Sequence, residues 1–356
     1  MIVLGSTGSI GVNTLYIAQK FSLDVEVLVA GSNIKLLNQQ IEIHKPKVVV
    51  IGDKADIKDV NHTNVFFGNE AILEVIANSS SELVVNALVG FLGLRPTLKA
   101  IECGKKVALA NKESLVAAGS FVDISKIHPI DSEHFGLWYL LQDKPISKMI
   151  ITASGGAFRD WDLEKIKSAT LKDALNHPNW SMGQKITIDS ASMMNKLFEL
   201  LEARWLFGDD IEYDAFIEPK SLIHALINFK DGSTTAHIAN ANMQLPISHA
   251  ILNSVEEQIL EPIDFLKVGQ LNFKKIEVER YPIWEIKDDI LKNPHRGVVI
   301  NAANEVAIEK FVAGKISFLD ISKEVITAYN KFDVKAKNSE DIFEIDKEVR
   351  AYISNV

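Results

Sequence analysis

A glycine-rich segment directly after the first apolar run limits the possible folds of this chain more than any other feature. Gly5, Gly8 and Gly11 lie between the strand-like residues Ile2–Leu4 and an amphipathic stretch at Val12–Phe21. Glycines at such a turn let the backbone approach a pyrophosphate, which then faces the free N–H groups of the helix start. The spacing is G-x-x-G-x-x-G rather than G-x-G-x-x-G, and a plain strand-to-helix turn is the alternative interpretation.

Residues 1–130 alternate strand-like and helix-like segments, which favours the nucleotide-binding interpretation of the loop. The further expected strands are Val25–Ala30, Val48–Ile51, Val65–Phe67, Leu83–Leu88 and Lys106–Leu109. The further expected helices are Ile34–His44, Ala71–Asn78 and Pro96–Cys103. Alternation of this kind predicts βαβ units and a parallel, doubly wound sheet.

The pattern changes in the second part of the chain, where we expect an α+β region and then helices. Its expected strands are Met149–Thr152, Tyr213–Ile217, Leu222–Phe229 and Thr234–Ala239, and its strongest helical pattern runs over Ser190–Phe207. The predicted class is therefore α/β. It comprises a Rossmann-like nucleotide-binding domain over 1–130, an α+β domain over 131–253, a linker over 254–283 and a C-terminal helical bundle over 284–356.

Charge and composition exclude several classes of partner. The formal net charge is −9 and no Lys/Arg run with interleaved aromatics occurs, so we expect no nucleic-acid partner. No apolar run approaches the about 20 residues of a membrane span. The single cysteine, Cys103, excludes an internal disulfide and fits a reducing, cytoplasmic location; we expect it to be a small packed residue.

The residues after the second expected strand indicate which nicotinamide cofactor the loop accepts. An acidic residue there would hold the ribose 2′-OH and repel a 2′-phosphate. This chain has Gly31, Ser32 and Asn33 instead, with Lys35 close behind. Hydroxyl, amide and ammonium donors favour a phosphate, so the segment predicts NADPH.

Two acids and one polar helix stripe are candidates for a metal and phosphate site. Asp131 and Glu133, at i and i+2 in an expected extended loop, can share a hard cation, although a solvated pair or a helix N-cap is the common alternative. Asn195, Lys196 and Glu199 form a polar stripe on the helix Ser190–Phe207, whose alternative is a solvent-exposed Lys–Glu surface. Oxygen ligands favour Mg²⁺ or Mn²⁺ over zinc.

Two further segments follow expected strands. Ser154–Gly156 offers a hydroxyl and N–H groups that could converge on one phosphate. Asn111–Ser114 lies at the carboxyl edge, where doubly wound folds bind ligands. A helix N-cap is the alternative for Asn111, and it is compatible with a catalytic Lys112.

Together these motifs resemble the 1-deoxy-D-xylulose 5-phosphate reductoisomerase family over nearly the whole chain and in the same order. The matching segments are Leu4–Gly11, Ala110–Ser114, Asp131–His134, Ser154–Gly156, His177–Gly183, Asp189–Ala191, Met193–Lys196, Glu202–Trp205 and Asn301–Glu305. The resemblance implies roles for individual residues. The implied cofactor-binding residues are Thr7, Gly8, Ser9, Ile10, Gly31, Ser32, Asn33, Asn111, Glu113 and Gly183. The implied metal ligands are Asp131, Glu133 and Glu199.

The implied substrate-binding residues are Lys112, Ser132, Glu133, Ser154, His177, Ser190, Asn195, Lys196 and Glu199, and the catalytic set comprises Lys112, Asp131, Glu133, Glu199 and His177. Trp180–Met182 would be a flexible flap. Ser32 stands where some members have lysine, so the grip on the 2′-phosphate is weaker or shifts to Lys35. For His177, a structural histidine is the alternative.

The resemblance further implies an NADPH-dependent oxidoreductase that uses Mn²⁺ or Mg²⁺. It would rearrange and reduce 1-deoxy-D-xylulose 5-phosphate, a small phosphorylated sugar, to 2-C-methyl-D-erythritol 4-phosphate in isoprenoid precursor biosynthesis, as a homodimer. One rival is a semialdehyde-dehydrogenase-type enzyme, which needs a catalytic cysteine in mid-chain; Cys103 has no such setting. The other is an NADPH-sensing or scaffold protein, which predicts cofactor binding without metal-dependent turnover.

Overall fold

The computed structural model describes residues 1–355, which divide into two compact units. The first unit comprises residues 1–114, 122–132 and 242–261, and the second comprises residues 115–121, 133–241 and 262–356. The second unit thus contains both the α+β region and the C-terminal helices. The boundaries of the four domains expected from the sequence stay predictions.

The first unit is built on a seven-stranded sheet in which every neighbouring pair is parallel. Its strands are β1 (Ile2–Leu4), β2 (Val27–Val29), β3 (Val48–Ile51), β4 (Val65–Phe67), β5 (Leu83–Asn86), β6 (Lys106–Leu109) and β7 (Ile127–Pro129). The order β4-β3-β2-β1-β5-β6-β7 reverses direction beside β1, as in a doubly wound nucleotide-binding sheet. The predicted fold class is confirmed.

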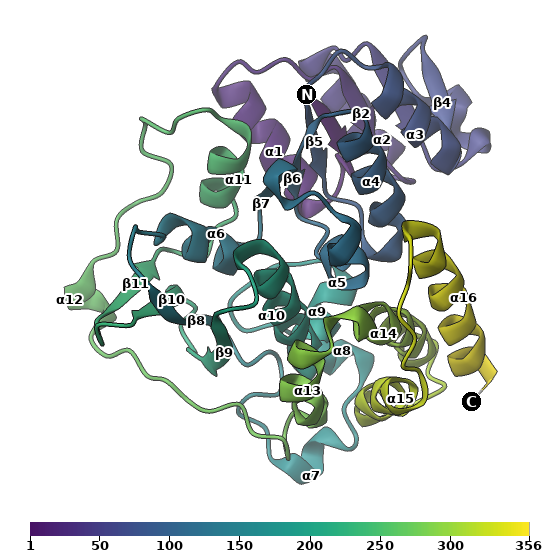
Figure 1. Cartoon of the computed structure of the whole chain (residues 1–356). Coiled ribbons are helices and arrows are strands. Elements are labelled where there is room, and N and C mark those ends of the chain that lie inside the picture. Colours follow the sequence, from purple (N-terminus) through teal and green to yellow (C-terminus); the bar gives the residue numbers. More distant parts are fainter. Residues whose placement is uncertain (356) are drawn as a thin grey trace. The chain divides into compact units, whose positions relative to one another are not determined.

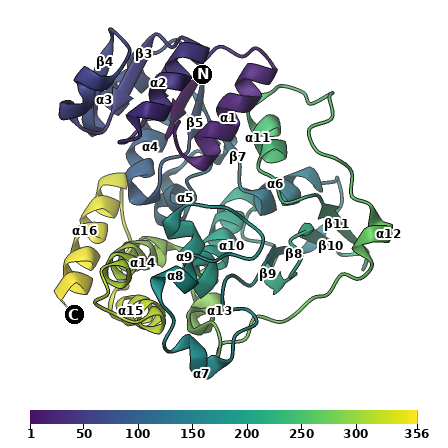
Figure 2. The ribbon, with the colours of Figure 1, turned by 180° about the vertical axis from the view of Figure 1, so that it is seen from behind.

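Helices on both faces bury this sheet. They are α1 (Ser9–Lys20), α2 (Ile34–His44), α3 (Gly68–Asn78), α4 (Leu94–Glu102), α11 (Gln244–Ile251) and the start of α5 (Glu113–Ala118). Figures 1 and 2 show α1 beside α11, and apolar residues of both helices pack on the sheet together. Burial on both faces explains the nearly continuous Val, Ile and Leu runs of the strands.

The second unit contains a four-stranded sheet of order β11-β10-β8-β9. Its strands are β8 (Ile146–Ala153), β9 (Glu212–Ile217), β10 (Ile223–Phe229) and β11 (Thr234–Ile238), and its helices before β9 are α6 (Ser132–Tyr139), α7 (Leu163–Ile166), α8 (Leu171–Ala174), α9 (Gln184–Ser192) and α10 (Met194–Phe207). Strand β10 is antiparallel to β8 and β11, whereas β8 and β9 are parallel.

The C-terminal helices of this unit pack against the elements that follow β8. These helices are α13 (Lys287–Lys292), α14 (Gly297–Val312), α15 (Phe318–Lys331) and α16 (Ser339–Asn355). Figure 2 shows α14 and α15 side by side with α16 next to them. Phe158 and Ile188 share one buried cluster with Phe311 and Phe318, so the C-terminal helices support the segments around β8 and α9.

The structure corrects three expectations from the sequence. The predicted helix Ser190–Phe207 is two helices, because Met193 has a φ of +69° and ends α9 before α10 begins. The acidic pair does not lie in an extended loop, because α6 begins at Ser132. Cys103 is exposed rather than packed, since it caps the end of α4 ahead of Gly104.

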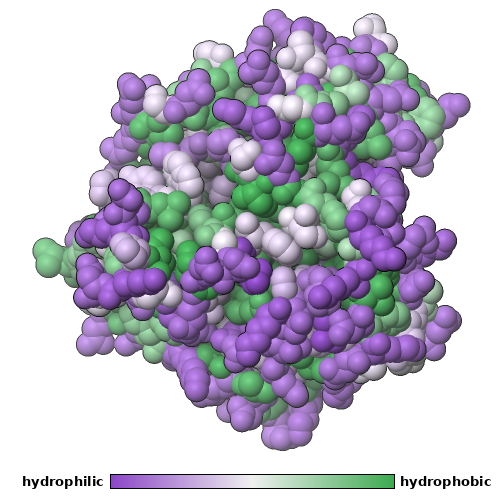
Figure 3. Space-filling view, viewed as in Figure 1, coloured by the Kyte–Doolittle hydropathy of each residue, from purple (hydrophilic) through white to green (hydrophobic). Residues whose placement is uncertain are grey.

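The short helix α12 (Phe265–Val268) carries exposed apolar side chains. Figure 3 shows an apolar projection at the left edge of the molecule over this helix, where the side chains of Phe265 and Leu266 are 58% and 96% exposed. Among the described residues, no helix is both long and apolar enough to cross a membrane.

Candidate functional site

The glycine-rich loop after β1 brings two backbone segments into close contact. Gly5 has a φ of +80°, and a Cβ there would lie 2.5 Å from the carbonyl oxygen of Ala87, just after β5. A Cβ on Gly11 would lie 2.3 Å from the carbonyl oxygen of Gly5. Gly8 is the N-cap of α1, and no side-chain hydrogen bond caps the first N–H groups of this helix. The loop is therefore built to receive an anion at a helix start.

The other residues of the predicted cofactor site differ in their exposure. In the loop, Thr7 and Ile10 are partly buried and Ser9 is exposed. After β2, Gly31, Ser32 and Asn33 are all exposed.

The amide of Asn33 caps α2, because its Oδ1 accepts a hydrogen bond from Leu36 N at 3.2 Å. Its side chain is partly engaged in the fold, whereas Ser32 keeps an exposed hydroxyl.

Asn111 ties together the loops at the carboxyl edge of the first sheet. Its Nδ2 donates to the carbonyl oxygens of Leu88 and Gly90 at 2.9 and 2.8 Å, and to Glu113 Oε2 at 3.1 Å. Its Oδ1 accepts from Ser114 N at 3.2 Å, in the first turn of α5. The capping role expected as an alternative for Asn111 is confirmed, and the role of Asn111 and Glu113 in lining a cofactor stays a prediction.

Lys112 and Asp131 meet at the same edge. Lys112 follows β6 and Asp131 follows the neighbouring parallel strand β7, so the sheet brings both residues to one end. Lys112 Nζ lies 2.7 Å from Asp131 Oδ2, and the two side chains are only 7% and 11% exposed. A largely buried ion pair of this kind holds both side chains in one position. Removing either partner lowers the free energy of unfolding, because the other charge is then buried without a partner.

The polar stripe of α10 faces inward. Asn195, Lys196 and Glu199 are 9%, 7% and 1% exposed, so the solvent-exposed interpretation of this stripe is wrong. Lys196 Nζ pairs with Glu199 and lies 3.1 Å from Glu133 Oε1, while Asn195 Nδ2 donates to Glu199. His224 Nδ1 lies 3.9 Å from Glu133 Oε1. Buried charges of both signs thus meet in one cluster.

Three carboxylates of this region are close enough to share one cation. Asp131, Glu133 and Glu199 each offer an oxygen, and these oxygens lie within 4.8 Å of one another. Asp131 and Glu133 are two residues apart around the start of α6, and Glu199 comes from α10. An all-oxygen donor set suits Mg²⁺ or Mn²⁺ rather than zinc. The three residues therefore fit the metal predicted from the sequence.

A buried histidine contacts the backbone of one of these carboxylate residues, Glu199. His134, in α6, is fully buried, and its Nε2 lies 2.8 Å from the carbonyl oxygen of Glu199, so Nε2 carries the proton. Its Nδ1 lies 3.2 Å from Oε2 of Glu202, which is 1% exposed. His134 and Glu202 belong to motifs quoted from the sequence, but neither was among the predicted site residues.

Two predicted phosphate contacts and one predicted substrate contact come together from separate segments. Ser154 follows β8, His177 lies between α8 and α9, and Ser190 lies in α9. His177 Nε2 is 2.9 Å from Ser154 Oγ and 3.2 Å from Ser190 Oγ. Gly156 N donates to Ser154 Oγ at 3.1 Å. The structure thus places two hydroxyl groups around one imidazole nitrogen.

The hydrogen bonds of His177 determine its tautomer. Its Nδ1 accepts from the backbone N–H groups of Asn179 and Trp180 at 3.2 and 2.9 Å, so the ring proton resides on Nε2. Burial, and then the positive charges of Lys196 and Arg159, lower the pKa of His177 to about 4. At neutral pH the ring is therefore uncharged and donates from Nε2 to the serine hydroxyls.

The predicted flap is anchored at its first residues. Asn179 Nδ2 donates to the carbonyl oxygen of Pro219 at 2.9 Å and to Ser221 Oγ at 2.7 Å. The Trp180 ring centroid lies 6.4 Å from that of His224 in an edge-to-face arrangement. Gly183, the N-cap of α9, is exposed. The cofactor contact of Gly183 and the movement of the flap stay predictions.

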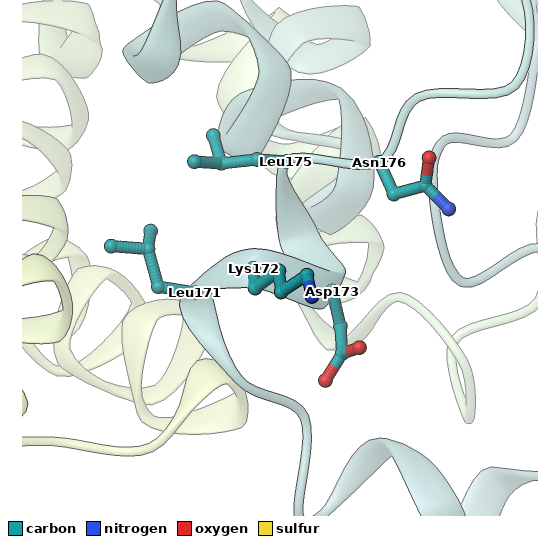
Figure 4. Close-up of a pocket in the computed structure, with 5 residues that line it drawn as sticks. All are labelled: Leu171, Lys172, Asp173, Leu175 and Asn176. Atoms are coloured by element: carbon teal, nitrogen blue, oxygen red, sulfur yellow. The ribbon is translucent and has the colours of Figure 1, made fainter.

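A surface pocket lies just before this segment but contains none of the predicted residues. It is lined by Leu171, Lys172, Asp173, Leu175 and Asn176. In Figure 4 Leu171 and Leu175 point to one side of the short helix α8, while Asp173 and Asn176 point away from them. No charged or hydroxyl group of the site reaches this pocket, so we assign no ligand to it.

Three residues that hydrogen-bond to the Ser154–Gly156 loop and to the residue before Ser190 were not predicted from the sequence. One guanidinium nitrogen of Arg159 donates to the Ser154 carbonyl at 2.9 Å, and Tyr281 Oη donates to the Gly155 carbonyl at 2.8 Å. Asn304 Nδ2 donates to Asp189 Oδ1 at 2.7 Å, one residue before Ser190. No spacing in the sequence pairs these positions. Only the resemblance of Asn301–Glu305 to a family motif marked one of them.

Comparison with protein-family models matches most of the chain to one family. Residues 1–119 match the model described as 1-deoxy-D-xylulose 5-phosphate reductoisomerase. Residues 127–207 match the model of the C-terminal domain of the same enzyme, and residues 238–352 match a DXP reductoisomerase C-terminal domain. The three matches occur in chain order.

Curated relatives and solved structures agree with these models. The 1-deoxy-D-xylulose 5-phosphate reductoisomerase of Nautilia profundicola is 60% identical and covers 99% of this chain and 98% of the relative. That of Wolinella succinogenes is 52% identical and covers 99% of each. A DOX-P reductoisomerase crystal structure in complex with NADPH, fosmidomycin and magnesium superposes with a TM-score of 0.92 at 32% identity, covering 99% of this chain and 97% of that one. The Zymomonas mobilis enzyme in complex with NADPH gives a TM-score of 0.89 at 35% identity, with the same shares covered.

Proposed function

Because the chain belongs to the 1-deoxy-D-xylulose 5-phosphate reductoisomerase family, we propose that the residues described above carry that family's reaction. The chain is an oxidoreductase that converts 1-deoxy-D-xylulose 5-phosphate to 2-C-methyl-D-erythritol 4-phosphate with NADPH and a divalent metal. The observation that carries the assignment of residues is the convergence of three carboxylate oxygens within 4.8 Å of one another. Lys196, 7% exposed, pairs with two of these carboxylates.

Asp131, Glu133 and Glu199 would hold the metal. Their oxygens match the preference of Mg²⁺ and Mn²⁺, and both metals remain candidates. The loop at Gly5–Gly11 would hold the NADPH pyrophosphate, because its glycines leave room that a Cβ would fill and α1 begins there. Ser32 and Asn33, with Lys35 behind them, would face the 2′-phosphate.

The phosphate of the sugar would bind at the opposite end of the substrate from the reacting carbons. Ser154, Ser190, Asn195 and Lys196 supply two hydroxyls, an amide and an ammonium group, all donors that suit a phosphate. His177 supports the hydroxyls as an uncharged donor. Binding energy from this remote group orients the reacting part of the substrate.

When bound, the divalent cation supplies a Lewis acid for the substrate oxygens, and NADPH supplies the hydride that reduces the rearranged aldehyde. Lys112 would add positive charge beside the substrate oxygens, because its ammonium already lies 2.7 Å from Asp131. Ser132 would contact the substrate from the start of α6. The flap at Trp180–Met182 would exclude water while the intermediate is present.

The experiment that tests the function is NADPH oxidation with 1-deoxy-D-xylulose 5-phosphate, measured with Mg²⁺, with Mn²⁺ and with EDTA. We expect oxidation with either metal and none with EDTA. NADPH binding without any metal-dependent oxidation would contradict the proposal. It would instead favour an NADPH-sensing or scaffold protein.

We also propose that the chain is a homodimer in the cytoplasm. The family resemblance supports the dimer, and α6 offers exposed aromatic residues for an interface, with Trp138 47% and Tyr139 58% exposed. Light scattering of the wild type should give the mass of two chains. A mass of one chain at micromolar concentration would contradict the dimer and leave the chemistry untouched.

A further inference from the structure

The loop Ser154–Gly156 has its carbonyl groups held by two side chains that lie outside the set of predicted phosphate contacts. Arg159 donates to the Ser154 carbonyl oxygen at 2.9 Å, and the same guanidinium nitrogen donates to the Pro219 carbonyl oxygen at 3.1 Å. Tyr281, which is 1% exposed, donates to the Gly155 carbonyl oxygen at 2.8 Å. The Ser154 and Gly155 carbonyls therefore point toward Arg159 and Tyr281.

A fixed carbonyl also fixes the N–H group of the next residue. The described peptide bonds are all trans, so the C=O and the following N–H point in opposite directions across a planar unit. Because Arg159 holds the Ser154 carbonyl, the Gly155 N–H points away from Arg159. This N–H donates to no acceptor within residues 1–355. It is free to donate to a ligand.

The second peptide unit orients the hydroxyl of Ser154. Because Tyr281 holds the Gly155 carbonyl, the Gly156 N–H points the other way and donates to Ser154 Oγ at 3.1 Å. Ser154 Oγ also accepts from His177 Nε2 at 2.9 Å. With both lone pairs of Oγ engaged, the hydroxyl proton remains to be donated outward.

The backbone conformation of the loop depends on glycine and on the side chain of Arg159. Gly155 and Gly156 have φ values of +88° and +65°. A Cβ on Gly155 would lie 2.6 Å from the Arg159 side chain, and a Cβ on Gly156 would lie 2.6 Å from the Ser190 carbonyl oxygen. The loop thus lies between the Arg159 side chain on one side and the end of α9, at Ser190, on the other.

We propose that Arg159 and Tyr281 are positioning residues of the phosphate subsite, which turn the Gly155 N–H and the Ser154 O–H toward the substrate phosphate. The proposal rests on the proposed function and adds a main-chain donor to its set of phosphate contacts. Tyr281 lies 126 residues after Gly155, so the segment leading into the C-terminal helices takes part in substrate binding. Neither side chain needs to touch the substrate.

The chain offers a matched control for Tyr281. Tyr213, 6% exposed, also donates its hydroxyl to a glycine carbonyl, that of Gly208 at 2.6 Å, but at the end of α10. Tyr281→Phe and Tyr213→Phe therefore remove the same kind of hydrogen bond, one at the phosphate loop and one away from it. For Arg159, the conservative variant is Arg159→Lys. Asp160→Asn controls for the exposed ion pair of Arg159 with Asp160.

The experiment measures KM for 1-deoxy-D-xylulose 5-phosphate, kcat, and the competitive inhibition constant of inorganic phosphate. We expect Tyr281→Phe and Arg159→Lys to raise KM and the phosphate inhibition constant about tenfold, equivalent to about 1.4 kcal/mol, with a much smaller change in kcat. The binding constant of NADPH should not change in either variant. Tyr213→Phe and Asp160→Asn should keep the wild-type KM, whatever Tyr213→Phe does to the melting temperature.

Equal KM values in Tyr281→Phe and Tyr213→Phe would overturn the proposal, because the loop orientation would then not matter for phosphate binding. Failure of the proposed function has a different signature, namely no metal-dependent turnover by the wild type. In that case a titration of wild type and Tyr281→Phe with inorganic phosphate, measured by calorimetry, still tests whether the loop binds phosphate. Phosphate binding that is equal in the two proteins would contradict it.

Discussion

Two glycine-containing loops, one after β1 and one after β8, offer N–H groups to an anion, but they are held in place differently. The loop at Gly5–Gly11 is closed partly within its own turn, since Gly8 N donates to the Gly5 carbonyl at 3.0 Å and α1 follows directly. Neighbouring elements of the first unit hold the rest, because Gly5 N and Ser6 N donate to the Val29 carbonyl and Gln40 Nε2 donates to the Ser6 carbonyl at 2.8 Å. The loop at Ser154–Gly156 opens no helix of comparable length. It is held by Arg159 and by Tyr281, a residue 126 positions away.

The difference shows two ways in which a sequence can specify an anion site: through neighbouring residues, or through residues far along the chain. A helix start provides oriented N–H groups whenever the glycines allow the turn, and the outside contacts of the first loop come from neighbouring elements of the same sheet and its helices: the ends of β2 and β5, and α2. The second loop needs two side chains to orient its peptide units, the nearby Arg159 and the distant Tyr281. Changes far along the chain should therefore affect sugar phosphate binding and leave NADPH binding intact.

Among the changes that compare the two loops, the largest effect is expected from exchanging one glycine in each. In Gly11→Ala the new Cβ would lie 2.3 Å from the Gly5 carbonyl oxygen, and in Gly156→Ala it would lie 2.6 Å from the Ser190 carbonyl oxygen at a φ of +65°. Strain of this kind costs on the order of 1–3 kcal/mol. We expect Gly11→Ala to weaken NADPH binding about tenfold or more, and Gly156→Ala to raise KM for the sugar phosphate by a similar factor.

Fluorescence titration with NADPH and steady-state kinetics separate the two effects. Gly232→Ala serves as a control for a positive φ glycine, at +89°, in the turn between β10 and β11. If Gly156→Ala weakened NADPH binding as strongly as Gly11→Ala does, the two loops would not be independent.

A smaller effect is expected from the contact between α14 and α9. Asn304 donates to the 2% exposed Asp189 at 2.7 Å, and Asn304→Ala leaves that carboxylate oxygen without this donor. The loss should cost about 1–3 kcal/mol of unfolding free energy and shift Ser190, so KM for the sugar phosphate should rise a few-fold. Thermal denaturation and kinetics measure both effects.

Asn293→Ala is the matched control, because Asn293 also donates to an aspartate, Asp289 at 3.2 Å, but on an exposed part of the chain. It should leave KM unchanged. An Asn304→Ala enzyme that loses stability while keeping the wild-type KM would limit the role of α14 to folding.

The smallest expected effect concerns the pH dependence of stability through His177. Its pKa is about 4 in the folded chain against 6.5 in the unfolded chain, so protonation favours unfolding as the pH falls through this window. The stability that the uncharged ring contributes is complete above pH 6.5 and is lost progressively toward pH 4.

Melting temperatures of wild type and His177→Gln across this range measure the effect. The gap between the two proteins should narrow as the pH falls from 6.5 to 4. A gap that is constant with pH would mean that His177 has an ordinary pKa. A large loss of stability in His177→Gln at neutral pH, with an unchanged KM, would instead favour a structural histidine.

The fold of the first unit was predictable because its signals are local. Runs such as Val48–Ile51 and the glycine turn after Ile2–Leu4 match the observed strands and loop. The break at Met193 was not predictable, since nothing in the sequence marks a methionine with a φ of +69°. The break separates Ser190 from Asn195 onto two helices.

The candidate site was predictable where the resemblance supplied the residues, and much less from their spacing. Periodicity left Asn195, Lys196 and Glu199 as either a surface or a site, and burial in the folded unit excludes the surface. The supporting contacts of Arg159 and Tyr281 join positions that no local pattern relates. Residues that touch a ligand repeat as motifs, whereas residues that orient them depend on the tertiary fold.

The most direct test of the central assignment is a comparison of Glu199→Gln with Glu212→Gln. Glu199 is one of the three clustered carboxylates and is only 1% exposed. Glu212, in contrast, is an exposed glutamate of β9 that pairs with Lys148. The measurement is the rate of NADPH oxidation with 1-deoxy-D-xylulose 5-phosphate as Mg²⁺ or Mn²⁺ is titrated, with NADPH binding measured in parallel. We expect Glu199→Gln to lower turnover by roughly 10²–10³-fold and to weaken the metal dependence, while NADPH binding in this variant and all properties of Glu212→Gln stay close to wild type. Unchanged metal-dependent turnover in Glu199→Gln would contradict the assignment.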